Sequence, residues 1–220
     1  MSSMATRQLL AALGAAFASA TGQAVHFESV GGVDAARRVR DGEAFDIVVL
    51  ASDALDGLAA EGHVLPGSIA PMARSPMAVA VRAGAGRPDI GSEQALKQAV
   101  LAAGRIGYST GPSGAALLGL LERWGLAAAL QDRLLQARPG IPVAQLIAAG
   151  EVELGFQQLS ELMHVDQVDV LGTLPAGAGI TTVFSAAVCA RTERAAEARA
   201  LLDFMRSPET AGLRQRCGMR

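Results

Sequence analysis

The stretch "FDIVVLASDALDGLAAEGHVLP" (residues 45–66) contains the clearest secondary-structure pattern of the chain. Its first six residues form a nearly continuous apolar run, which is typical of a strand buried on both faces of a parallel sheet. Ser52 or Asp53 follows, and either side chain can cap the N-terminus of a helix. Gly62 and Pro66 would end that helix. The stretch therefore predicts a strand followed by a helix, the repeating unit of an α/β protein.

The same alternation extends along the chain in both directions. Helical patterns cover residues 5–19, 31–42, 92–103, 113–124, 141–149, 158–163, 192–206 and 208–216. Strand patterns cover residues 24–29, 105–108, 133–137, 152–156 and 168–172. Two longer β segments, near 76–82 and at 180–190, bracket the middle third, as two chain crossings between lobes would. We predict an α/β fold with two mostly parallel sheets flanked by helices: lobe one at 1–78 plus 184–220, lobe two at 79–183, and a ligand cleft between them.

Composition excludes several classes of function. The formal net charge is −2 and the longest cationic cluster is Arg37, Arg38 and Arg40, so no nucleic-acid surface is predicted. No run of 18 apolar residues is present, so no membrane span is predicted. Cys189, Cys217 and the three scattered histidines lack metal-ligand spacing. Neither a P-loop lysine nor a G-x-G-x-x-G after a strand occurs, so we predict no metal, nucleotide or other cofactor.

The segment "GYSTG" (107–111) matches the G-x-S-x-G motif of serine hydrolases. That motif needs a helix to start directly after the serine, but Gly111 and Pro112 intervene here. Asp132 and His164 follow in the order of a triad, yet neither lies in a convincing loop, and no HGGG-type motif is present. We therefore do not assign a hydrolase.

A cradle for an anion uses more of this loop. Ser109, Thr110 and Ser113 supply hydroxyl donors, while Gly111 and Gly114 let the backbone approach a ligand closely. The first amides of the following helix are donors without partners, at its positive end. The sequence thus predicts a binding site for a carboxylate or oxyanion here.

Other loops add to this candidate site, because polar residues follow several of the predicted strands. Ser2 and Ser3 precede the first helix, Gly31 and Gly32 precede the second, Arg74 and Ser75 lie at the first crossing, and Gln157 and Gln158 open the helix after "VELGF". Arg74 is the one cation that we predict for the site.

These residues, in this order, resemble the molybdate-type, class II periplasmic substrate-binding proteins. The resemblance runs through "SSMATRQLLAAL", "GGVDAARRVRDGEAFDIVVLASDALDGLAAEGHV", "GEVELGFQQLSEL" and "RALLDFMRSPETAGLRQRCGM". It implies a periplasmic binding protein that closes about a hinge on a small anionic ligand, acts as a monomer and serves an ABC permease.

Departures from the family pattern indicate a ligand other than molybdate. Gly31 and Gly32 stand where the family has serines, and Gln158 stands where it has a tyrosine. More room and a side-chain amide favour a larger organic carboxylate.

The family also includes aconitate isomerase-like relatives, which interconvert cis- and trans-aconitate by a 1,3-proton shift. A carrier and such an isomerase are therefore both open hypotheses. Glu161, His164 and Tyr108 are the candidate bases for the isomerase.

The N-terminal stretch has helical spacing (Leu9, Leu10, Leu13, Phe17) and a lone Arg7, so we identify no export signal in it. The resemblance implies the periplasm, whereas a complete sequence without a signal would imply the cytoplasm. Family members have a strand just before the Ser-Ser loop, so we expect the sheet of lobe one to lack its first strand.

Overall fold

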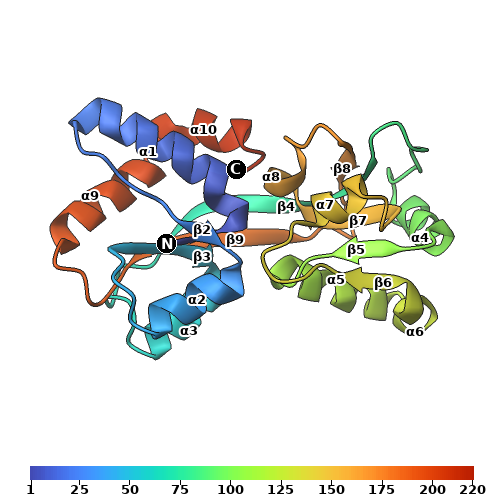
Figure 1. Ribbon diagram of the computed structural model, residues 1–220, viewed down its shortest axis with the longest axis horizontal. Coiled ribbons are helices and arrows are strands. Elements are labelled where there is room, and N and C mark those ends of the chain that lie inside the picture. The colour runs from blue at the N-terminus through green and yellow to red at the C-terminus, as the bar shows by residue number, and fades with distance from the viewer. The chain divides into compact units, whose positions relative to one another are not determined.

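The computed structural model describes residues 1–220 and divides them into two compact units (Figure 1). Unit 1 comprises Met1–Arg74 and Val183–Arg220, and unit 2 comprises Ser75–Thr182. The chain leaves unit 1 within strand β4 (Ala70–Arg82) and returns to it within strand β9 (Thr181–Val188). No helix combines the length and the apolar character needed to cross a membrane.

The sheet of unit 1 has the strand order β2-β1-β3-β9. Its further strands are β1 (Ser2–Ser3), β2 (Ser29–Val30) and β3 (Ile47–Ala51). Strand β1 runs parallel to β2 and to β3, and β9 runs antiparallel to β3. The expectation that Ser2 and Ser3 lie in a loop is therefore wrong, since they form a strand inside the sheet. The predicted strand at 24–29 shortens to β2, because β1 offers only two residues for it to pair with.

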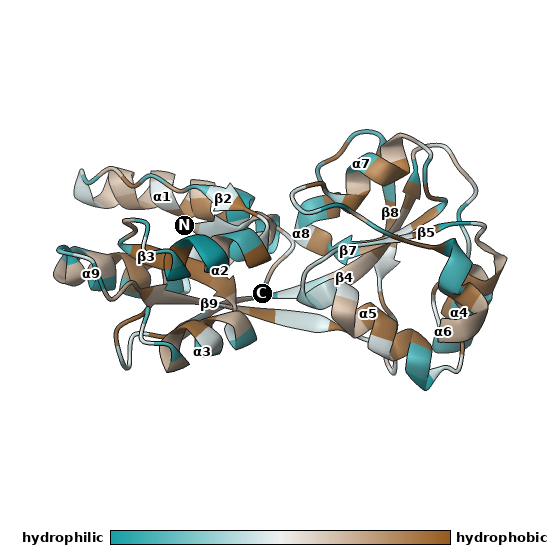
Figure 2. Cartoon of the chain, turned by 60° about the horizontal axis from the view of Figure 1, so that its bottom comes forward, coloured by the Kyte–Doolittle hydropathy of each residue, from teal (hydrophilic) through white to brown (hydrophobic).

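Alternate residues of β3 point to opposite faces of this sheet, as strand geometry requires. Ile47 and Val49 join one apolar cluster with α1 and α9, whereas Val48 and Leu50 join another with α2 and α3. The helices of unit 1 are η1 (a 3-10 helix, Met4–Thr6), α1 (Arg7–Thr21), α2 (Gly32–Arg40), α3 (Ser52–Ala60), α9 (Ala195–Arg206), η3 (a 3-10 helix, Pro208–Thr210) and α10 (Ala211–Arg216). Figure 2 shows α2 as largely hydrophilic, in keeping with its three arginines.

The sheet of unit 2 has the order β8-β4-β7-β5-β6. Its further strands are β5 (Ile106–Tyr108), β6 (Leu134–Gln136), β7 (Leu154–Gln158) and β8 (Val168–Thr173). Strand β5 is parallel to β6 and β7, while β4 is antiparallel to β7 and β8. The helices are α4 (Glu93–Ala102), α5 (Pro112–Arg123), α6 (Ala127–Leu130), η2 (a 3-10 helix, Gln131–Arg133), α7 (Val143–Ala148) and α8 (Leu159–Leu162).

Helices cover both faces of this second sheet as well. Met77 and Val79 pack against leucines of α4 and α5, whereas Ala78 and Ala80 pack against α7. The prediction that Gln157 and Gln158 begin a helix is wrong. They are the last two residues of β7, because their backbones pair with Ala78 and Met77 of β4 and so prolong the ladder.

Candidate functional site

In unit 1, the predicted site residues lie at the carboxyl ends of β1 and β2. The Ser2 hydroxyl lies 2.7 Å from the Ser29 hydroxyl. A Cβ built on Gly32 would lie only 3.7 Å from Cβ of Ser3, so helix α2 begins directly beside Ser3. Gly31 is the N-cap residue of α2 and offers no side chain to the first amides of the helix. This corner of unit 1 therefore presents hydroxyl groups beside unfilled N–H donors.

Ser52 belongs to the same edge of the sheet, although from the sequence we predicted only a capping role for it. Its hydroxyl lies 2.8 Å from that of Ser185 and donates to the Val183 carbonyl at 3.2 Å. The N-cap of α3 is Ala51, so the predicted cap by Ser52 is wrong, whereas Asp53 Oδ1 accepts from the Ala54 N–H in the first turn at 2.9 Å. The serine turns toward β9 instead, because Ser185 is its hydroxyl partner there. A small polar residue directly after a buried strand was the available signal.

In unit 2, the loop after β5 lies tightly against the first turn of α5. A Cβ built on Gly114 would lie 1.8 Å from the carbonyl oxygen of Ser109, so only glycine fits at this position. The Ser109 and Ser113 hydroxyls lie 2.9 Å apart, Gly111 is the N-cap residue, and Thr110 is exposed. Since α5 starts three residues after Ser109, the loop does not have the geometry of a nucleophile elbow.

The end of β7, the neighbour of β5, carries the two glutamines. Gln157 is fixed at both atoms of its amide: Oε1 accepts from the Val143 N–H at 2.9 Å, and Nε2 donates to Glu161 at 2.8 Å. Gln158 Nε2 donates to the Thr182 hydroxyl at 2.6 Å. The register of β4 against β7 pairs Met77 with Gln158, and Ser160 follows in helix α8.

Five buried side-chain polar atoms in the chain have no hydrogen-bond partner. They are the hydroxyls of Ser3, Ser75, Ser160 and Ser207, and Oε1 of Gln158. Buried polar groups are nearly always paired, because an unpaired one forfeits its bonds to water. Three of the five, Ser3, Ser75 and Gln158, are residues that the sequence singled out for binding, and Ser160 follows Gln158 by two residues.

The charged and titratable candidates differ in how they are held. Arg74 is exposed on β4, and its backbone pairs with that of Arg220. The Glu161 carboxylate accepts a hydrogen bond from Gln157 Nε2, and Glu161 directly follows Ser160 in the chain. His164 is exposed beyond the end of α8, whereas Tyr108 packs partly buried against the apolar cluster under α5. Of the three candidate bases, Glu161 alone adjoins one of the unpartnered hydroxyls.

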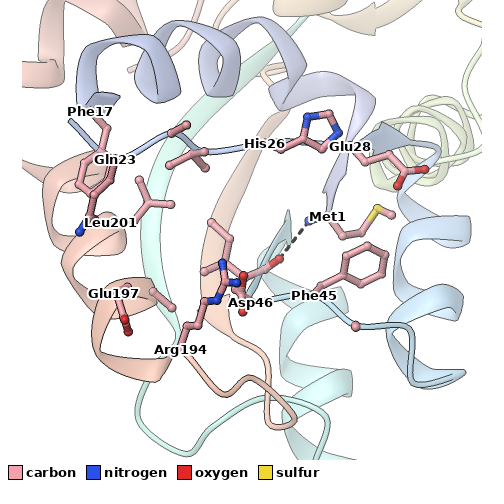
Figure 3. Close-up of a pocket in the computed structure, with 15 residues that line it drawn as sticks. Met1, Phe17, Gln23, His26, Glu28, Phe45, Asp46, Arg194, Glu197 and Leu201 are labelled. Atoms are coloured by element: carbon pink, nitrogen blue, oxygen red, sulfur yellow. Dashed lines mark hydrogen bonds between the residues drawn. The ribbon is translucent and has the colours of Figure 1, made fainter. Parts of the chain in front are cut away.

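A separate cavity of about 700 Å³ lies within unit 1, at the amino-terminal ends of β1 and β3 (Figure 3). Its lining includes the carboxylates of Glu28, Asp46 and Glu197 but a single arginine, Arg194, so it does not suit an anion. The Met1 amine lies at its edge and donates to the Ile47 carbonyl at 3.0 Å. Burial lowers the pKa of that amine. None of the predicted site residues lines this cavity.

Comparisons with known proteins agree on the family. The sequence profile described as "Bacterial extracellular solute-binding protein" matches residues 1–220. Aconitate isomerase from Pseudomonas sp is 35% identical over 179 residues, which cover 79% of this chain but only 66%, just under two thirds, of that protein.

The periplasmic molybdate-binding protein of Azotobacter vinelandii superposes with a TM-score of 0.83 at 23% identity, covering 100% of this chain and 96% of that one. The sulfate-binding protein SubI from Mycobacterium tuberculosis H37Rv gives a TM-score of 0.77 at 17% identity, with coverages of 100% and 84%. These likenesses confirm the predicted type II periplasmic-binding-protein fold, and the chain belongs to the family of bacterial extracellular solute-binding proteins.

Proposed function

We propose that this protein binds a small organic carboxylate and delivers it to an ABC-type permease. The observation that carries the proposal is the set of buried, unpartnered polar atoms at the predicted site residues. Hydroxyl groups such as those of Ser3, Ser75 and Ser160 donate readily to carboxylate oxygens. The free amides at the N-terminus of α5 add donors and partial positive charge, so no buried cation is needed.

An organic ligand rather than a bare metal oxyanion is supported by the side chains that are present. Gly31 and Gly32 bring no side chain to the start of α2 and leave room there. Gln158 places a carbonyl oxygen among the donors of unit 2, and that atom would repel an oxyanion that carries no hydrogen.

A second candidate function is isomerisation of the ligand. The likeness to aconitate isomerase, at 35% identity, favours it. Glu161 is the base that the geometry supports best, since Gln157 fixes the position of its carboxylate. It would take a proton from one allylic carbon, the double bond would shift, and the proton would return at the other end of the allyl unit. No atom is gained or lost in that exchange.

One sample distinguishes the two functions: the protein mixed with trans-aconitate in D2O and followed by proton NMR. A carrier leaves the ligand chemically unchanged while binding it stoichiometrically. An isomerase produces the cis isomer with deuterium at carbon. Absence of both binding and turnover would contradict both functions for this tricarboxylate.

Serine variants test whether the unpartnered hydroxyls bind the ligand. We expect Ser3→Ala and Ser75→Ala each to raise Kd about tenfold, because a hydrogen bond to a charged group contributes about 1.5–3 kcal/mol. Ser207→Ala is the matched control, since Ser207 has the same unpartnered, buried hydroxyl but belongs to no predicted site. Equal Kd values for all three variants would refute the assignment.

A further inference from the structure

The sheet of unit 1 has unpaired backbone on both sides of one cavity. Strand β1 is only two residues long and lies between β2 and β3. Residues 24–27, which precede β2, make no backbone hydrogen bond, and neither does Phe45, just before β3. Residues of both segments line the cavity of about 700 Å³ in Figure 3. The cavity therefore continues the line of β1 between two stretches of unpaired backbone.

Strand β3 presents a backbone donor to this cavity. The Ile47 carbonyl accepts from the Met1 amine at 3.0 Å, and the Val49 N–H donates to the Met1 carbonyl at 3.0 Å. Alternate residues of a strand point their backbone groups to the same side, so the Ile47 N–H also faces the line of β1. It lies beyond the end of β1, where that strand offers it no acceptor. Ile47 is buried, so its N–H calls for a partner from an added segment.

The cavity has the dimensions of one strand. Because β1 lies between β2 and β3, those two strands are about 9.6 Å apart, which is two strand spacings. A residue in a packed sheet occupies about 3.3 Å along the strand, 4.8 Å across it and 10 Å through the sheet, or ~160 Å³. A volume of about 700 Å³ therefore accommodates about four strand residues.

The lining states the chemistry of the segment that fits. Phe17 and Leu201 belong to the apolar cluster on the α1 and α9 face of the sheet, and Phe45 packs against the cluster on the α2 and α3 face. A strand buried between two such faces is apolar throughout. The three carboxylates of the lining outnumber its one arginine, so a basic residue at one end of the segment is favoured.

We infer that this cavity is a slot for one added β-strand, which an extended apolar peptide of about four residues with a basic end fills. The peptide accepts from the Ile47 N–H on one side and pairs with residues 24–27 on the other. Its alternate side chains enter the two apolar clusters. Backbone pairing supplies the affinity and the apolar clusters supply the selectivity, as in other strand-addition complexes.

Two capped peptides test the slot on the full chain: acetyl-Lys-Val-Ile-Val-Ala-amide, and the same peptide N-methylated at its central Val-Ile-Val. The side chains are identical, but the methylated peptide lacks the N–H donors of a strand. We expect it to bind about tenfold more weakly in titration calorimetry. The unmethylated peptide should also slow hydrogen exchange of the Ile47 N–H about tenfold, whereas the Ile106 N–H, in β5 of unit 2, should keep its rate.

Equal affinity of the two peptides would identify an apolar pocket without strand pairing and would overturn the inference. Failure of both peptides to bind would overturn it as well. A concentration-dependent dimer that protects the Ile47 N–H without peptide would make a second copy of the chain the occupant, and the peptide assignment would then be wrong.

Discussion

Substituting Gly114 by alanine should destabilise unit 2 through a backbone clash. The new Cβ would lie 1.8 Å from the carbonyl oxygen of Ser109, and relief requires the two segments to separate to about 3 Å. A carbonyl oxygen cannot rotate away as a side chain can, so the loop or the helix must move. Such overpacking costs about 1–3 kcal/mol, partly offset by about 1 kcal/mol of helix propensity.

Gly119→Ala is the matched control, because Gly119 lies in the same helix and its new Cβ would meet nothing within 4 Å. Its free energy of unfolding should rise by about 1 kcal/mol, because alanine has a higher helix propensity than glycine. The two variants should therefore differ by about 1–3 kcal/mol in the free energy of unfolding, measured by urea titration of Trp124 fluorescence. Ligand affinity should fall in Gly114→Ala only. Equal stability of the two variants would refute the close contact between loop and helix.

Three further predictions concern other parts of the chain. Phe156→Ala should cost about 3–5 kcal/mol in urea unfolding, because Phe156 is among the largest fully buried side chains; a loss below 1 kcal/mol would contradict its core position. Bonds from Trp124 and Lys97 lower the pKa of Glu93 below 4.5, so their stabilising effect is present above pH 4.5 and is lost as the pH falls through the folded pKa. Glu93→Gln should flatten that acid-side slope in a thermal-unfolding series. Burial raises the pKa of Cys189 to about 11, so at pH 8 its thiol should react with a disulfide reagent far more slowly than a free cysteine.

The sequence predicted those features that local patterns determine. Continuous apolar runs such as Ile47–Leu50 and amphipathic spacing such as Leu9, Leu10 and Leu13 identified the strands and helices of an α/β fold. Gly114 was predicted to let a ligand approach the backbone, whereas in the structure its nearest neighbour is the carbonyl oxygen of Ser109.

The predictions that failed concern residues whose contacts are with partners far away in the chain. The Ser52 hydroxyl turns from its helix toward Ser185, which lies 133 residues on. Gln157 and Gln158 continue a strand because β4, far earlier in the chain, pairs with them. Whether a buried hydroxyl such as that of Ser160 lacks a partner depends on every neighbour in three dimensions. The spacing of residues within a single segment therefore cannot predict these long-range contacts.

The division of the chain into two units also determines the order in which its parts can fold during synthesis on the ribosome. Unit 2 is one uninterrupted segment, Ser75–Thr182, whereas unit 1 needs residues from both ends of the chain. Helix α1 is made before unit 2, yet its leucines pack against α9 and α10, which are made after unit 2 (Figure 1). Unit 2 can therefore complete its core during synthesis, while the apolar face of α1 stays uncovered until the last helices emerge. Helix α1 therefore waits through the synthesis of unit 2 before it is buried, and during this interval its apolar face is exposed to aggregation.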